Sequence, residues 1–150
     1  MTVSSLVLDF PPGLPEHAAD YLRAKLAFHA DSADLAHDLA ARVPGIAVID
    51  ARAPDAYRAA HIPGAVNVPH RTMDAATTAG LDRDAVYVVY CDGIGCNGST
   101  KGAYKLALLG FRVKELIGGL DWWRRDGYPV AQGEQPGTFG AAAPAAACAC

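Results

Sequence analysis

The feature that most limits the fold is a regular alternation between short apolar segments and segments with helical periodicity. Residues 46–50 (IAVID) and 85–90 (AVYVVY) are almost continuously apolar, as expected for strands that are buried on both faces of a parallel sheet. Residues 65–69 and 112–117 are expected to form two further strands. Because helices connect parallel strands, the pattern predicts an α/β fold with helices on both faces of the sheet.

Apolar spacing and Pro or Gly boundaries predict the helices. The expected helices are residues 15–29, 31–45, 54–61, 99–110 and 120–127, and residues 70–83 are expected to be loop with some helix. From residue 131 the chain is rich in Gly, Ala and Pro and has hardly any large apolar residue. We therefore expect three parts, since such a composition favours disorder: an N-terminal helical extension (1–30), an α/β domain (31–130) and a flexible tail (131–150).

The composition excludes several functional classes. The 150 residues, 51% of them hydrophobic, suffice for one core, and the net charge of -3 comes from mixed acids and bases. Without a basic run we expect no nucleic-acid partner, and without a long apolar stretch no membrane span. The N-terminus lacks the pattern of a signal peptide, so a cytoplasmic protein with reduced thiols is expected. Its four cysteines, Cys91, Cys96, Cys148 and Cys150, then indicate chemistry or chance and not a disulfide framework.

The segment that follows residues 85–90 carries the strongest chemical signal. Cys91 stands where that strand ends, which is where ligands bind in open α/β folds. Glycine-rich backbone and the start of the next helix can direct N–H groups at an anion, which would lower the pKa of a thiol and make Cys91 a nucleophile. The residues expected to line this anion site are Asp92, Gly93, Ile94, Gly95, Cys96, Asn97, Gly98, Ser99 and Lys101.

Two features of this segment have alternative interpretations. Lys101 lies in the first turn of a helix that contains no acid. It is either a solvated lysine or the partner of a bound anion, since a cation is unfavourable at a helix N-terminus. Residues 93–98 also match G-x-G-x-x-G, a dinucleotide-binding pattern, with Glu115 as the ribose-binding acid. Against that alternative, Glu115 falls inside a strand, and only one more strand follows the loop.

The segments VIDARAPDAYRAAHIPGAVNVP (48–69), VYVVYC (86–91) and LALLGFRVKELIGGLDWWRRDGYPV (106–130) together resemble a rhodanese-type sulfurtransferase domain. The resemblance covers about residues 31–130. It implies a parallel five-stranded sheet whose fourth strand is followed by the active cysteine, here Cys91. In that family the cysteine takes a sulfane sulfur as a persulfide and passes it to a nucleophile. The resemblance thus implies thiosulfate or a persulfide as donor, a thiol or cyanide as acceptor, and neither cofactor nor metal.

The family's two signatures also map onto residues outside the loop. The first matches Asp50, Arg52, Asp55, His61, Gly64 and Asn67, and the second matches Gly118, Gly119, Trp122, Gly127, Tyr128 and Pro129. We expect Asp50 and Arg52 to pair at a strand end and His61 to fix a loop by hydrogen bonds. Both tryptophans, Trp122 and Trp123, are expected to pack the last helix onto the sheet.

The loop departs from the family pattern Cys-x-x-Gly-x-Arg-Ser, because it is longer and has no arginine. A preference for thiosulfate therefore stays open, with Lys101 as a substitute point charge. A related phosphatase or arsenate reductase would need an arginine where Asn97 stands. A non-catalytic binding module of the same fold is a further alternative.

The additional cysteines leave other functions open. Cys96 can resolve a persulfide or sulfenate on Cys91 as a disulfide, or it is a small buried residue without a redox role. A Cys91/Cys96 redox sensor is thus an alternative function. The tail is long enough to bring Cys148 and Cys150 to the loop, where they would carry sulfur, bind a metal or be inert. A homodimer through helix 15–29 is also open.

Overall fold

The computed structural model describes residues 4–140, and the alternation of strands and helices expected from the sequence is present. The elements are α1 (Pro15–Phe28), β1 (His29–Ala30), α2 (Ser32–Ala41), β2 (Ile46–Asp50), α3 (Pro54–Ala59), β3 (Val66–Asn67), β4 (Val86–Tyr90), α4 (Gly98–Leu108), β5 (Arg112–Leu116) and α5 (Gly119–Arg125).

The sheet has five strands in the order β1-β5-β4-β2-β3, and all neighbouring strands are parallel. Asp50 at the end of β2 is paired with Tyr90 at the end of β4, so these two carboxyl ends lie side by side. The expected five-stranded parallel sheet is confirmed. Its edge strand β1 was expected to be part of the N-terminal extension, because two residues give no alternation that a sequence pattern can reveal.

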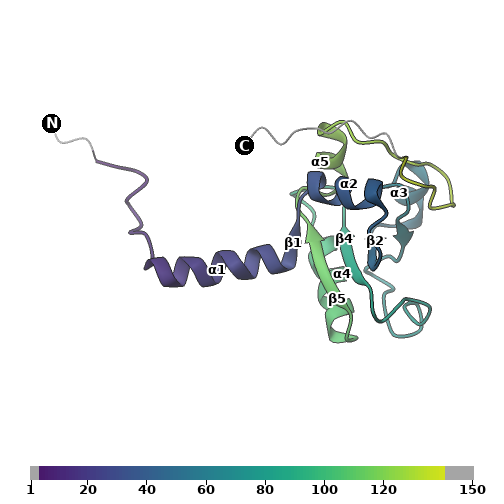
Figure 1. Cartoon of the computed structure of the whole chain (residues 1–150), viewed down its shortest axis with the longest axis horizontal. Coiled ribbons are helices and arrows are strands. Elements are labelled where there is room, and N and C mark those ends of the chain that lie inside the picture. Colours follow the sequence, from purple (N-terminus) through teal and green to yellow (C-terminus); the bar gives the residue numbers. More distant parts are fainter. Residues whose placement is uncertain (1–3, 141–150) are drawn as a thin grey trace.

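Helices cover both faces of the sheet, as predicted (Figure 1). Because side chains alternate along a strand, Val88 and Tyr90 of β4 face the core formed with α2, α3 and α5. Tyr87 and Val89 face the second core, formed with α4. Burial on both faces explains why β2 and β4 are continuously apolar.

Helix α1 extends away from the rest of the domain, and none of its residues is buried (Figure 1). Leu22 and Leu26, which repeat at helical spacing, are 52% and 75% exposed. Lys114 of β5 donates a hydrogen bond to the carbonyl oxygen of Leu26 at 2.9 Å and so ties the end of the helix to the sheet. None of the helices within residues 4–140 is both long and apolar enough to cross a membrane.

Residues 131–139 lie against the domain, so the expectation of a flexible segment from residue 131 does not hold for them. The backbone groups of His61 and Ala131 exchange two hydrogen bonds, at 2.8 and 2.9 Å. Phe139 is buried against Trp123, with ring centroids 5.7 Å apart. Phe139, His61 and backbone hydrogen bonds to Arg58 and Gly64 thus hold a segment whose composition favours disorder. Cys148 and Cys150 lie outside the described residues.

The two tryptophans of α5 have different environments. Trp123 is fully buried, and its indole N–H donates to the carbonyl oxygen of Pro129 at 2.8 Å. Trp122 is 44% exposed and lies beside the guanidinium of Arg125. Trp123 therefore packs α5 onto the sheet as expected, whereas the same expectation for Trp122 is wrong because its position faces away from the core.

A buried ion pair joins the ends of β2 and β4. Arg52 and Asp50 form the expected pair, with Nη2 2.6 Å from Oδ2. The hydroxyl of Tyr90 donates to the same carboxylate oxygen at 2.5 Å. Arg52 also donates to the carbonyl oxygen of Ala60 at 2.6 Å and to the carboxylate of Asp92 at 3.1 Å. The network therefore reaches the residues on both sides of Cys91.

Burial and the Asp50 charge determine how these groups ionise. Burial lowers the pKa of Arg52, but the hydrogen bonds and charge of Asp50 outweigh it and raise that pKa overall. Burial and then Asp50 raise the pKa of Tyr90 far above its ordinary value. Arg52 thus stays charged and Tyr90 stays a neutral donor at any physiological pH.

Replacement of Arg52 by alanine is expected to destabilise the fold by about 3–5 kcal/mol, because the fully buried carboxylate of Asp50 loses its partner. Urea unfolding under reducing conditions measures the loss. Arg58→Ala is the matched control, since it removes an exposed pair with Asp55 and is expected to cost less than about 1 kcal/mol. Equal losses in the two variants would contradict the structural role of the buried pair.

Candidate active site

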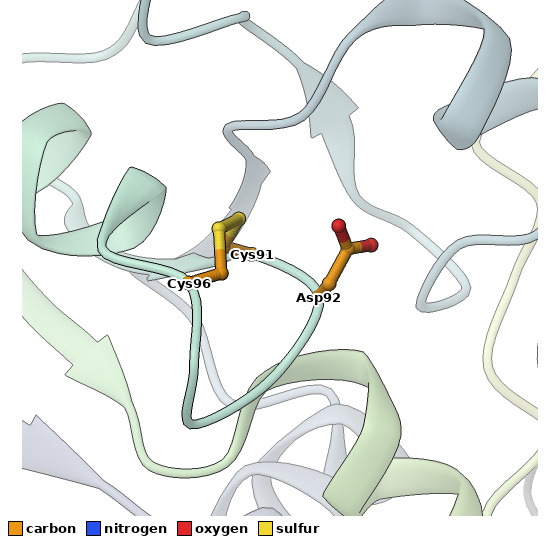
Figure 2. A group of neighbouring side chains, drawn as sticks. All are labelled: Cys91, Asp92 and Cys96. Carbon is orange, nitrogen blue, oxygen red and sulfur yellow. A yellow bond between two sulfur atoms is a disulfide. The ribbon is translucent and has the colours of Figure 1, made fainter.

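Cys91 and Cys96 are joined by a disulfide that closes the loop between β4 and α4 (Figure 2). Their Cα atoms are 6.3 Å apart, within the usual range for disulfides. Cys91 is only 4% exposed, whereas Cys96 is partly exposed. The two sulfurs are bonded and not reduced in this state, and of the two alternatives for Cys96 the structure shows the one in which it is the disulfide partner of Cys91. The separation of five residues lets the loop bring the sulfurs together.

The N-terminus of α5 holds the first residues of the loop. The backbone N–H of Leu120 donates to the carbonyl oxygen of Cys91 at 3.0 Å, and that of Asp121 donates to Asp92 at 2.7 Å. Only glycine fits at residue 119, since its φ is +58° and a Cβ there would lie 2.4 Å from the Cys91 oxygen. In a trans peptide the N–H of the next residue points opposite to the carbonyl. The N–H groups of Asp92 and Gly93 therefore point away from α5.

The N-terminus of α4 meets the two sulfurs. The N–H of Gly98 donates to Sγ of Cys96 at 3.4 Å. A Cβ at Gly98 would lie 2.8 Å from Sγ of Cys91 and 3.3 Å from Sγ of Cys96, so a side chain there would displace them. Within residues 4–140, this amide contact is made to Cys96 and not to Cys91, where it was expected. Both sulfurs of the disulfide therefore lie against the start of the helix.

Glu115 of β5 supplies an acid to the first turn of α4. The hydroxyls of Ser99 and Thr100 donate to its Oε1 at 2.7 and 2.8 Å. The helix itself has no acid in this turn, as the sequence shows, but the fold brings one from the neighbouring strand. Glu115, which the dinucleotide-binding alternative would need to bind a ribose, thus accepts hydrogen bonds from the protein itself.

His70 borders the sulfurs, although no sequence pattern singles it out. A Cβ added to Gly98 would lie 3.2 Å from Cδ2 of His70 and 2.8 Å from Sγ of Cys91. His70 and the Cys91 sulfur therefore flank the same position. Burial and then the charges of Lys101, Arg71 and Lys105 lower the pKa of His70. Three cations therefore lie near His70, and Nζ of Lys105 donates to its carbonyl oxygen at 2.6 Å. Its position in the sequence could have indicated it, because His70 follows β3, and the carboxyl ends of β3 and β4 lie at the same edge of the sheet.

A cavity of about 480 Å³ opens beside the loop, towards Glu115 and Gly118, and His70 does not line it. Cys96 lines it and Cys91 does not. The loop residues Gly93, Ile94, Gly95, Asn97 and Ser99 also line it, and Ile94 is 79% exposed. Cys96 is therefore the sulfur that a molecule entering this cavity meets.

The ligand atoms of Cys91, Asp92 and Cys96 lie within 4.8 Å of one another (Figure 2). In this state the two sulfurs are bonded to each other and are not thiolates, which are the form that binds metals. The Asp92 carboxylate is paired with Arg52. The disulfide form therefore does not offer a thiolate metal site at this position.

The remaining signature residues support the loop from a distance. The ring nitrogens of His61 lie 2.9 Å from the carbonyl oxygen of Tyr57 and 3.1 and 3.2 Å from those of Gln135 and Pro136. Asn67 donates to the carbonyl oxygens of Asp50 and Arg52, at 3.1 and 2.9 Å. Other signature positions lie elsewhere: Asp55 pairs with Arg58 on the surface, and Tyr128 packs on Trp123.

Comparisons with known proteins agree with this architecture. Residues 32–126 match the model of the rhodanese-like domain family. The chain is 38% identical over 99 residues to "Thiosulfate sulfurtransferase GlpE" of Pseudomonas entomophila, covering 63% of this chain and 86% of that protein. It is 35% identical over 92 residues to "HTH-type transcriptional regulator Rv0324" of Mycobacterium tuberculosis, and the match covers 61% of this chain but only 40% of that regulator.

Among solved structures, the BH2092 protein of Bacillus halodurans superimposes with a TM-score of 0.77 at 42% identity, over 88% of this chain and 93% of that one. The parallel five-stranded sheet, the cysteine after β4 and the matched segment lead to one assignment. The chain belongs to the rhodanese-like domain family.

Proposed function

We propose that this chain is a sulfurtransferase that carries a sulfane sulfur as a persulfide on Cys91 and passes it to a thiol or to cyanide. The observation that carries the proposal is the position of the Cys91 sulfur, at the carboxyl end of β4 and against the first residue of α4. The relatives named thiosulfate sulfurtransferases support the same activity.

The reaction begins with the disulfide reduced. The Cys91 thiolate attacks the outer sulfur of thiosulfate, a sulfur–sulfur bond forms, and sulfite leaves with the electron pair of the bond that breaks. The negative charge stays close to the N-terminus of α4, whose dipole favours an anion. An acceptor nucleophile then removes the outer sulfur and restores the Cys91 thiolate.

The side of the loop with His70 suits an anionic donor. Arg71, Lys101 and Lys105 all act on His70 electrostatically. Three nearby cations can attract a dianion without the arginine that the family's loop usually carries. The nearby cations favour the interpretation of Lys101 as the partner of a bound anion over that of a solvated lysine.

The disulfide favours a second candidate, a Cys91/Cys96 redox sensor. A sensor would cycle between dithiol and disulfide in response to an oxidant and would not take up sulfur from thiosulfate. Transfer of sulfur to the reduced protein therefore separates the two functions.

Cys91→Ser is expected to abolish sulfite release from thiosulfate and sulfur uptake by the protein, because a serine hydroxyl forms no persulfide. Sulfite assays and intact mass, both started from reduced protein, measure the loss. The double variant Cys148→Ser/Cys150→Ser is the matched control and is expected to release sulfite like the unmodified chain. Retained sulfite release in Cys91→Ser would refute the proposal.

Lys101→Ala is expected to raise the KM for thiosulfate about two- to fivefold, since an exposed charge interaction contributes up to about 1 kcal/mol. The increase should shrink at high salt, because added ions screen exposed charges. Arg124→Ala, which removes an exposed cation from α5, makes the same change in net charge and is expected to leave the KM unchanged. If Lys101→Ala and the unmodified chain had equal KM values for thiosulfate at low salt, a role of Lys101 in binding the donor would be contradicted.

A further inference from the structure

We propose that Cys96 is an internal acceptor that releases the transferred sulfur as hydrogen sulfide and leaves the Cys91–Cys96 disulfide. The chain would then reduce thiosulfate to sulfite and sulfide at the expense of a dithiol. This inference rests on the proposed function for its first step, the formation of the Cys91 persulfide.

Proximity makes Cys96 the nearest acceptor. The structure shows its sulfur within bonding distance of the Cys91 sulfur. A turn with a 3.0 Å hydrogen bond from the Cys96 N–H to the Gly93 carbonyl folds the loop back, and the amides of α5 hold its other end. Because both ends are fixed, Cys96 has a large advantage over any acceptor that must arrive from solution.

Burial limits the competing route. Cys91 is 4% exposed, so a donor and an external acceptor must each reach a buried position, whereas Cys96 is already beside it. The Gly98 N–H at the start of α4 donates to Sγ of Cys96. A helix N-terminus stabilises a thiolate, so the same contact favours Cys96 as the attacking sulfur once the disulfide is reduced.

The step balances in atoms and electrons. The Cys96 sulfur attacks Sγ of Cys91, the Cys91–Cys96 bond forms, and the bond between Sγ and the outer sulfur breaks. The outer sulfur leaves with that electron pair and takes the Cys96 proton, so it departs as HS⁻. Two thiols are thus oxidised to a disulfide while the sulfane sulfur is reduced to sulfide.

A dithiol resets the protein from the side of the cavity. Cys96 lines the cavity of about 480 Å³ and Cys91 does not, so a thiolate that enters meets the Cys96 sulfur first. Cys91 then leaves as a thiolate next to the start of α4. One acid, Glu115, and one lysine, Lys25, also line this cavity.

A single-turnover experiment tests the proposal. The full chain with Cys148→Ser and Cys150→Ser is reduced, freed of reductant and mixed anaerobically with thiosulfate. Sulfite, sulfide and intact protein mass are measured. We expect sulfite and sulfide in equal amounts and a protein two hydrogens lighter than the dithiol form. Without thiosulfate the protein should keep both thiols.

The same background with Cys96→Ser provides the decisive comparison. It is expected to release sulfite but no sulfide above the protein-free background, and to become one sulfur atom heavier. If the parent instead keeps the added sulfur and releases no sulfide, the internal acceptor is refuted and the proposed function stands. If Cys96→Ser releases sulfide as the parent does, the role of Cys96 as internal acceptor is likewise refuted. If neither protein releases sulfite, the proposed function itself fails.

Discussion

The buried pair of Asp50 and Arg52 is the interaction on which the site depends. Asp50 accepts a hydrogen bond from the hydroxyl of Tyr90, the residue before Cys91. Arg52 donates a hydrogen bond to the carboxylate of Asp92, the residue after Cys91. One ion pair from β2 therefore fixes both neighbours of Cys91 at the end of β4. Since an unpaired buried charge is costly, the pair leaves this part of the backbone little freedom.

The loop that follows is defined by contacts from two helices. Helix α5 binds the carbonyl oxygens at the beginning of the loop, and the first residue of α4 contacts both sulfurs at its end. The absence of a side chain at Gly98 lets the sulfurs approach the helix this closely. The result is one buried sulfur, on Cys91, and one accessible sulfur, on Cys96. The different roles proposed for the two thiols rest on this division.

The sequence predicts the sheet and its helices because strands buried on both faces need continuous apolar residues, as in β2 and β4. It predicts the position of Cys91 from the end of an apolar strand, and the Asp50–Arg52 pair from opposite charges at another strand end. It does not reveal β1, which is too short for a pattern, or the packing of Phe139, which depends on a pocket formed by distant residues. Nor does it reveal His70 near the sulfurs, and it leaves the Cys91–Cys96 bond as one of two alternatives, because both depend on the path of a loop.

The proposed sulfur carrier is Cys91. A crystal structure of the Cys96→Ser variant, after reaction of the reduced protein with thiosulfate, would show the sulfur in place. We expect electron density for one added sulfur bonded to Sγ of Cys91, at the start of α4 and near His70. An unmodified Cys91 in crystals whose protein has taken up sulfur at another cysteine would contradict it.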